Sequence, residues 1–302
     1  MSHRFVRNTD NPPGATGRWL HSRASLVQAG IGLLQKTRLV FRRHARVTIE
    51  MVDLLGMYKP KESLEMPAYS SAIWRFMPLP SLLSILQRRQ LFFPAAWTME
   101  DPYDSKLPKS ITKRFLEWEG LPDDGPKRKG AVTGDGVRHV VRGATCISCW
   151  HCNTIESAAM WSLYSPHHGV AIKTTIASLI RALEATTETI EIGKVQYIDF
   201  RRPARRDSRL WSSPTFVKRK SFEHERELRA AVLDLDVYRS LGTQEQLRGA
   251  MVNVDVEALI ERVYISPTVE DWIREVVKEE LRIHGLPRTD VIRSSLYSEE
   301  LA

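Results

Sequence analysis

Long apolar runs are missing from this sequence, since no window approaches the roughly 18 uncharged apolar residues of a membrane-spanning helix. Cysteine is scarce: the chain has three, all between Cys146 and Cys152, and they do not make the disulfide framework of a small secreted protein. The phosphate-binding G-x-x-x-x-G-K-S/T motif, the dinucleotide-binding glycine triplet and the esterase motif G-x-S-x-G are also absent, so nucleoside triphosphatase and esterase functions lack support. We therefore expect a cytoplasmic protein without a transmembrane segment.

The composition is that of a folded protein, and its positive charge is concentrated at one end. With 302 residues, 42% of them hydrophobic and 26% charged, the chain can bury a core and is not disordered throughout. Residues 1–49 hold nine Lys and Arg residues and one acid, Asp10, which accounts for the net charge of +8. The other residues carry 35 charges of each sign, so the net charge says nothing about the partners of the main domain.

Residues 1–57 are expected to form a basic extension that precedes a single domain at 58–302. Within 20–47 the apolar residues are spaced roughly as on a helix, with Arg and Lys between them. A basic amphipathic stretch of this kind binds anionic lipid or nucleic acid, or serves as a targeting peptide. The alternatives are a solvated arm and a start codon assigned too early, because Met51 and Met57 are both candidate starts. We base the functional expectations on the domain alone.

Hydrophobic periodicity in the domain predicts short strands interleaved irregularly with helices. We expect strands at 73–76, 91–93, 145–152, 169–173, 190–200 and 263–265, and helices at 79–86, at 156–164, from Thr174 or Thr175 to Leu183, after Asn253 or Asp255, and from Thr268 to Gly285. Asn153 or Thr154 is the expected N-cap of the helix at 156–164. This order is typical of an α+β fold with one mixed central sheet and flanking helices, the sheet being either continuous or split into two small sheets around a cleft.

The cysteines form a C-x2-C-x2-C pattern, which raises the question of a metal site or a nucleophile. A metal site needs the thiolates to converge. In a strand at 145–152, however, Cys146 and Cys152 point to one side and Cys149 to the other. Nothing in the sequence places a histidine base beside Cys149. We expect no metal, and we interpret the thiols as small buried hydrophobic groups.

Three charged residues late in the chain form a candidate functional group. If 225–233 is a strand, then Glu225, Glu227 and Arg229 point the same way, and the apolar residues between them point the other way. Such a row suggests a polar cleft in which a carboxylate stabilises developing positive charge. If the segment is a helix, Glu225 and Arg229 form an ordinary surface pair worth about 0.2–0.5 kcal/mol. Periodicity leaves both possibilities open.

Several separated motifs stand out along the domain. In chain order they read IWRF with the leucine-rich segment after it, DPYD, CWHCNTIESAAMWSLY, HHGVAIKTT, VQYIDF, FVKRKSFEHERELRA and VYISP. Together these motifs resemble the bacterial domain-of-unknown-function family 2971. The likeness covers roughly residues 70–296 and leaves the basic extension outside. Because the family name carries no activity, the resemblance implies common ancestry and leaves the function open.

The order of chemical groups is also similar to that of the ADP-ribosyltransferase fold, which has an early Arg or His on a strand, a central aromatic or Ser, and a late Glu on a strand. That resemblance implies NAD as a substrate bound in a cleft between two small sheets, with the Glu stabilising the ribosyl cation as nicotinamide leaves. Transferred to this chain, it assigns catalysis to Glu225, with Glu227 as the alternative, and cofactor binding to Arg75, Trp161, Tyr164 and Arg229. The Ser-Thr-Ser strand motif of many such enzymes is absent, so these roles rest on order alone.

Two other function classes compete with an NAD enzyme. A nucleic-acid-binding or nuclease component of a defence or toxin system is suggested by the basic extension, Arg201–Arg209 and Lys218–Lys220, all suited to phosphate. The acidic residues of this chain, however, lack the recognisable spacing of a metal-dependent nuclease site. The third class is a non-catalytic binding module, in which the row from Glu225 to Arg229 is a structural ion-pair network. A pocket shared with Arg75 would favour the first class, a contiguous basic surface the second, and a fully packed charged row the third.

Overall fold

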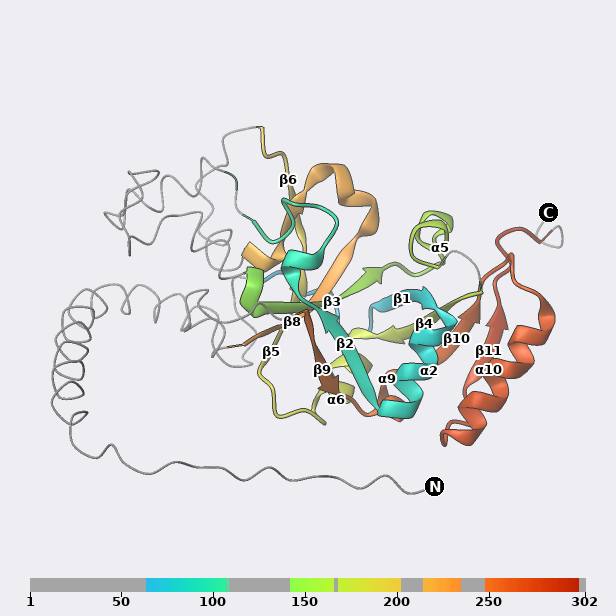
Figure 1. The fold of residues 1–302 in the computed structure, drawn as a ribbon. Helices are drawn as coiled ribbons and strands as arrows, with labels where there is room; N and C mark the ends of the chain where they lie inside the picture. The colour runs from blue at the N-terminus through green and yellow to red at the C-terminus, as the bar shows by residue number, and fades with distance from the viewer. Residues whose placement is uncertain are drawn as a thin grey trace, which may run out of the picture. The chain divides into compact units, whose positions relative to one another are not determined.

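A mixed seven-stranded sheet, in the order β11-β10-β4-β1-β3-β8-β5, forms the centre of the fold (Figure 1). The computed structural model describes residues 64–106, 108, 142–165, 168–201, 214–234 and 248–298, which belong to one compact unit. The sheet confirms the expected α+β class with one continuous central sheet. The basic extension at 1–57 and most of Arg201–Arg209 lie outside the described residues.

The sheet is antiparallel except at one edge, where β10 and β11 run parallel. Its strands are β1 (Ala72–Pro78), β3 (Thr145–Cys152), β4 (Gly169–Thr175), β5 (Ile190–Lys194), β8 (Glu227–Leu233), β10 (Arg262–Ile265) and β11 (Asp290–Arg293). Two small sheets pair β2 (Gln90–Pro94) with β9 (Gly249–Asn253), and β6 (Gln196–Ile198) with β7 (Val217–Arg219). The strand expected at 190–200 is therefore two strands, which belong to different sheets.

Five described helices and three short 3-10 segments connect the strands. They are α2 (Leu79–Arg88), α5 (Ala158–Tyr164), α6 (Ile176–Leu183), α9 (Val256–Leu259), α10 (Asp271–Ile283), η1 (Ala96–Thr98), η2 (Pro214–Phe216) and η3 (Lys220–Glu225). Thr175 and Asp255 cap α6 and α9, as expected. Gly285, with φ of 89°, ends the turn after α10, a left-handed position that glycine adopts without strain.

Two expected helix starts are wrong. Ser157 caps α5 by accepting the N–H of Met160 at 3.4 Å, so neither Asn153 nor Thr154 is the cap; Asn153 instead accepts the N–H of Thr154 in the preceding loop. The α10 helix begins at Asp271 without a side-chain cap, three residues beyond Thr268. Both errors arise because more than one Ser, Thr or Asn residue precedes each helix, and the sequence does not distinguish capping from a local turn.

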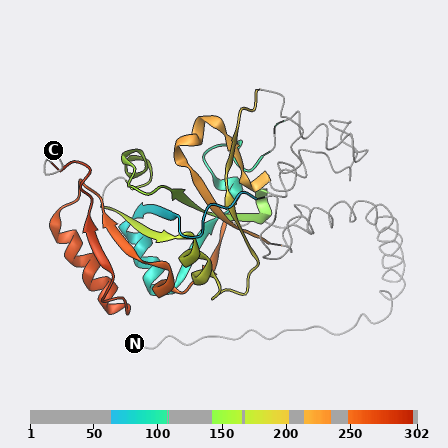
Figure 2. The same cartoon turned by 180° about the vertical axis from the view of Figure 1, so that it is seen from behind.

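One face of the sheet carries the main hydrophobic core. The apolar sides of α2, α6, α9 and α10 and the small β2–β9 sheet pack against it. Figures 1 and 2 show these helices together on one side of the sheet, with α5 on the other side. From α2, Leu82, Ile85 and Leu86 are buried in this core, each stabilising the fold by about 1.5–3 kcal/mol.

The opposite face carries two smaller apolar clusters, with polar side chains between them. Trp74 and Phe76 of β1 pack under Met160 and Trp161 of α5. The second cluster contains Ile147, Ala231 and Phe216, the last from η2. The polar residues between the two clusters come from β3, β8, β7 and η3, and they form the candidate site described below.

The cysteines alternate between these two faces, as expected for a strand. Cys146 and Cys152 pack with the main core, whereas Cys149 packs with the cluster around Ile147. All three are free thiols. Burial raises the pKa of Cys146 and of Cys152 to about 11, so both remain protonated at neutral pH.

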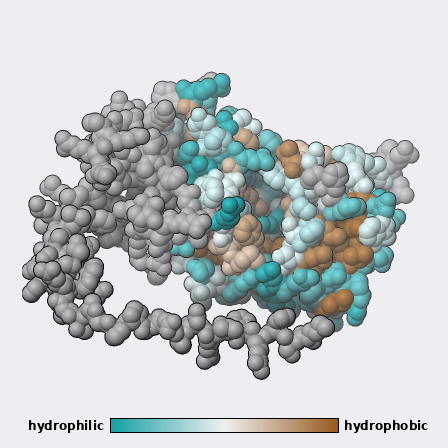
Figure 3. Space-filling model, viewed as in Figure 1, coloured by the Kyte–Doolittle hydropathy of each residue, from teal (hydrophilic) through white to brown (hydrophobic). Residues whose placement is uncertain are grey.

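The outer surface of α10 differs from its buried side. Trp272, Val276 and Ile283 are exposed, whereas Ile273, Val277 and Leu281 are buried. Apolar side chains, brown in Figure 3, gather on the surface over α2 and the neighbouring α10. In the part of the chain that the structure describes, no helix has both the length and the apolar character to cross a membrane.

Candidate functional site

The chain enters β8 through a tight turn that separates Glu225 from the strand. Glu225 is the last residue of η3, Arg226 adopts a left-handed conformation with φ of 44°, and β8 begins at Glu227. The expected strand therefore starts two residues late, and the alternative of a helix is wrong. Glu227 and Arg229 do share the face opposite to the main core, as alternation predicted.

Arg229 is fully buried and its guanidinium is bonded on every side. Nη1 and Nη2 donate to the two carboxylate oxygens of Asp104 at 2.7 and 2.8 Å, and Nε donates to Glu227 Oε2 at 2.5 Å. Nη1 also donates to the carbonyl oxygen of Thr215 at 2.6 Å. Bidentate, charge-assisted bonds of this kind hold both partners in one geometry. All three nitrogens thus already have protein acceptors, and the residue serves the structure.

Lys218 of β7 lies between three carboxylates. Its Nζ donates to Glu227 Oε1 at 2.6 Å and to Glu225 Oε2, and it is 3.5 Å from Asp104 Oδ2. We call Asp104, Lys218, Glu225, Glu227 and Arg229 the ionic cluster. Because the three carboxylates face two cations, the cluster carries a surplus negative charge when every carboxylate is ionised.

The surplus charge is located at Glu225. Burial, together with the neighbouring Glu227, raises the pKa of Glu225 to about 7, against the opposing attraction of Lys218. Burial acts the same way on Glu227, but Arg229 and Lys218 outweigh it and hold the pKa of Glu227 well below its usual range. Glu227 therefore stays ionised, and Glu225 is the carboxyl that exchanges its proton near neutral pH.

Tyr164 covers Glu225 on the side of the solvent. Its hydroxyl donates to Glu225 Oε1 at 2.9 Å, while the side chain, at the end of α5, is 42% exposed. Burial and the nearby Glu225 raise the pKa of Tyr164, so the hydroxyl remains a donor. Trp161, one turn earlier, is instead 4% exposed; its Nε1 donates to Glu156 and its ring meets Phe76 edge-on at 4.9 Å. Of the two expected aromatic residues, Tyr164 alone is bonded to Glu225.

His151 of β3 also contacts Glu225, and the sequence analysis missed it. Its Nδ1 lies 2.7 Å from the carbonyl oxygen of Glu225, and because a carbonyl oxygen only accepts, Nδ1 must carry the proton. Burial lowers the pKa of His151, so the ring is neutral and Nε2 bears an unprotonated lone pair. The signal was available in the alternation of β3, which puts His151 on the face of Cys149.

Within the part of the chain that the structure describes, the lone pair of His151 Nε2 has no hydrogen-bond partner. The side chain is 3% exposed, and no donor among the described residues reaches Nε2. An unsatisfied buried polar atom costs about 1–3 kcal/mol. Buried polar groups in native proteins are usually bonded, so this exception needs an explanation.

Arg75, the expected cofactor anchor, lies on the other face of the sheet. Along β1 it alternates with Trp74 and Phe76, which face the candidate site, and it shares its own face with the main core. Its guanidinium donates to Ser148 Oγ and, at 3.1 Å, to the carbonyl oxygen of Phe92. The structure therefore brings Glu225, Glu227, Arg229 and Tyr164 together but does not bring Arg75 to them. The expectation that Arg75 and Glu225 share a cleft is therefore wrong.

The basic run Lys218–Lys220 is not a free phosphate-binding surface. Lys218 is buried in the ionic cluster, and Arg219 donates to both carboxylate oxygens of Asp101 at 3.1 and 2.8 Å. The Arg219 guanidinium also stacks on Tyr103 and Phe222, at 5.0 and 5.3 Å. Two of the three positive charges are thus neutralised within the protein, which weakens the case for nucleic acid at this segment.

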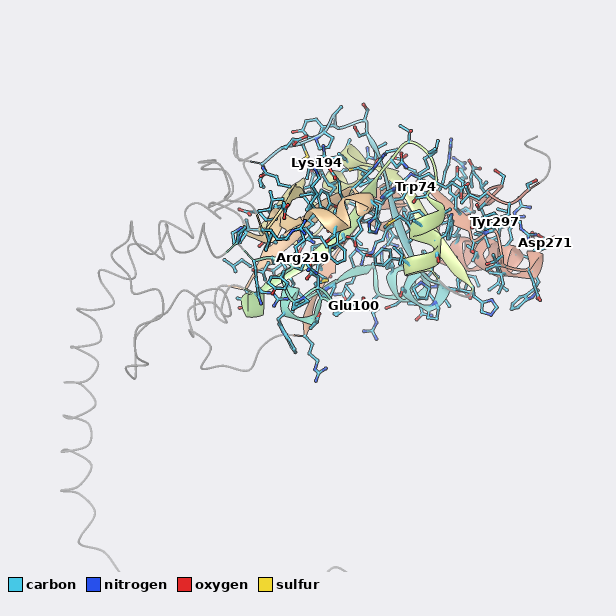
Figure 4. The ribbon with its side chains drawn as sticks, turned by 90° about the horizontal axis from the view of Figure 1, so that it is seen from above. Trp74, Glu100, Lys194, Arg219, Asp271 and Tyr297 are labelled. Carbon is cyan, nitrogen blue, oxygen red and sulfur yellow. The ribbon has the colours of Figure 1, made fainter. Side chains whose placement is uncertain are left out.

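Seen from above, the candidate site lies between the two ends of the sheet. Figure 4 shows Lys194, on the edge strand β5, at one end, and Asp271 and Tyr297, beside the other edge strand β11, at the opposite end. In this view Trp74 lies between the two ends, and Arg219 lies at the same end as Lys194. Within the described residues, no group of three or more His, Cys, Asp and Glu side chains is arranged to hold a metal ion.

No protein-family model matches the chain, and no curated protein matches its sequence.

Proposed function

We propose that the chain is a cytoplasmic enzyme that cleaves the bond between nicotinamide and ribose in NAD, either to transfer ADP-ribose or to release it to water. The observation that supports this proposal is the surplus carboxylate of Glu225, which shares a single ammonium with two other carboxylates beneath the hydroxyl of Tyr164. A fixed, desolvated negative charge is the group that stabilises a cationic transition state. The choice of NAD follows the likeness in motif order to the ADP-ribosyltransferase fold.

In this mechanism the ionised Glu225 acts on the ribose. As the C–N bond breaks, its electron pair leaves with nicotinamide, and positive charge develops on the sugar, where the carboxylate stabilises it. Tyr164 occupies the position on Glu225 Oε1 that a ribose hydroxyl would take, so binding exchanges one hydroxyl donor for another. Lys218 holds the other carboxylate oxygen in place, and Glu227 and Arg229 have a supporting role. Arg75 and Trp161 take no part in this proposal, and the acceptor is a protein, a nucleic acid or water.

The test is nicotinamide release by the full chain, measured with and without added protein, DNA or RNA. We compare Glu225→Gln with Glu223→Gln, a matched control because Glu223 is exposed and lies in the same 3-10 segment. We expect Glu225→Gln to reduce kcat by about 10²–10³-fold, the usual effect of removing an electrostatic stabiliser, and the control to retain activity. Full activity in Glu225→Gln would refute the assignment of that residue. No release by the wild type under any of these conditions would refute the proposed reaction.

A second candidate is a non-catalytic binding module, favoured by the closed bonding of Arg229 to Asp104, Glu227 and Thr215. Calorimetry run beside the nicotinamide-release assay separates the two candidates. A binding module would bind NAD or ADP-ribose in calorimetry and release no nicotinamide.

A further inference from the structure

The unpartnered nitrogen of His151 points toward the layer that contains Tyr164 and Glu225. In a histidine side chain Nε2 lies farther from the backbone than Nδ1, and Nδ1 here already reaches the Glu225 carbonyl in that layer. The imidazole also meets the Phe76 ring at 6.1 Å, on the side where Phe76 packs under α5. Nε2 is therefore directed out of the sheet, among groups contributed by η3 and α5.

The contacts of His151 fix what this nitrogen can bind. With the proton on Nδ1 and the ring neutral, Nε2 offers an acceptor and no donor. It cannot pair with a carboxylate, a phosphate oxygen or a carbonyl. It needs a group with an O–H or N–H, and Phe76 keeps the surroundings apolar.

We infer that His151 Nε2 is a ligand-binding group that accepts a hydrogen bond from an O–H or N–H of the substrate held at Glu225. The inference rests on the proposed function, since NAD presents both kinds of donor near its scissile bond, in the hydroxyls of the ribose and in the amide of nicotinamide. Glu225 and His151 then recognise two hydrogen-bond donors of one ligand. Glu225 binds the first donor through its carboxylate, and His151 binds the second through its ring. A ligand without the second donor would leave Nε2 unsatisfied and bind more weakly.

The variant that tests this is His151→Asn. The Asn amide can keep the donation to the Glu225 carbonyl that Nδ1 makes, and it places nothing where Nε2 was. Calorimetry of the full chain with ADP-ribose and, separately, with nicotinamide distinguishes the two donors. We expect about a 10-fold or greater loss of affinity, the usual scale for one buried hydrogen bond, for whichever of the two supplies the donor. His168→Asn is the control, because His168 is exposed and Asn tolerates its φ of 40°.

The outcomes separate this inference from the proposed function. If the wild type binds neither ligand and releases no nicotinamide from NAD, the proposed function fails and the inference fails with it. If the wild type binds and His151→Asn binds equally well, the inference alone fails. Weak binding in His151→Phe with normal binding in His151→Asn would also overturn it, because the role would then be the bond to Glu225. Should the Asn variant not fold, the ¹⁵N resonance of Nε2 in the wild type decides, since it must shift when ADP-ribose or nicotinamide binds.

Discussion

Replacing Arg229 with methionine should destabilise the protein strongly, because it leaves buried carboxylates without their main cation. Asp104 loses a bidentate partner, and Glu227 loses the bond to Nε. Lys218 is then the remaining cation of the ionic cluster beside three carboxylates. Methionine fills much of the same volume, so the effect reports charge and hydrogen bonding more than packing. Removing one partner of a buried ion pair costs about 3–5 kcal/mol, which lowers the Tm of a domain of this size by about 6–20 °C.

The assay is urea and thermal unfolding of Arg229→Met beside Arg262→Met. Arg262 is 52% exposed and pairs with Asp290 across β10 and β11 at 3.7 Å, so its loss should cost about 1 kcal/mol or less. Adding Asp104→Asn to Arg229→Met should recover part of the loss, because the variant then no longer buries that unpaired charge. The reasoning is refuted if Arg229→Met costs no more than Arg262→Met, or if Asp104→Asn has the same effect in both backgrounds.

Four further predictions concern the same face of the sheet. The folded-state pKa of Glu225, raised to about 7, lies above its unfolded value, so the folded state favours the protonated carboxyl. As the pH rises from about 4.5 to 7, the wild type should therefore lose stability relative to Glu225→Gln. Urea unfolding should show a loss of up to about 3 kcal/mol in the free energy of unfolding. Nicotinamide release should rise over the same approach to neutral pH, because the ionised form is the active one, and a rate that falls through pH 7 would contradict the mechanism. Tyr164→Phe should leave stability within about 1 kcal/mol and lower the KM for NAD, since no protein hydroxyl then competes for Glu225; an increased KM would contradict the exchange of hydroxyls. Gly169→Ala should cost about 1–3 kcal/mol, because the added Cβ would lie 2.4 Å from the carbonyl oxygen of Ser165 at the end of α5; unchanged thermal unfolding would show that this turn yields easily.

Some strands were predictable from the local sequence alone. The segment from Thr145 to Cys152 was correct to the residue, and so was the division of its cysteines between two faces. The strands β9 and β11 were missed because each is short and is paired only through contacts distant in the chain. Their formation depends on a partner strand, which local periodicity does not reveal.

The site was predictable only in part, for two physical reasons. Arg75 stands in a strand that is apolar on both faces, Ile73 and Met77 on one and Trp74 and Phe76 on the other, so the sequence could not tell which face it joins. The partner of Arg229 is Asp104, 125 positions away, and no local pattern links residues so far apart. By contrast, the alternation of side chains along a strand was enough to predict that Glu227 and Arg229 point the same way.

The buried charges of β8 also determine how this strand aligns with β3. In the observed register Cys149 lies opposite Arg229 and His151 lies opposite Glu227. A slip by one residue would turn both charged side chains into the main core and present Leu228 and Ala230 to Asp104 and Lys218. Each ion misplaced in this way would cost about several kcal/mol, whereas an all-apolar strand could slide at little cost. The ionic cluster thus excludes the competing alignments of the sheet, and a variant in which these charges are replaced by hydrophobic residues could be stable yet populate more than one strand register.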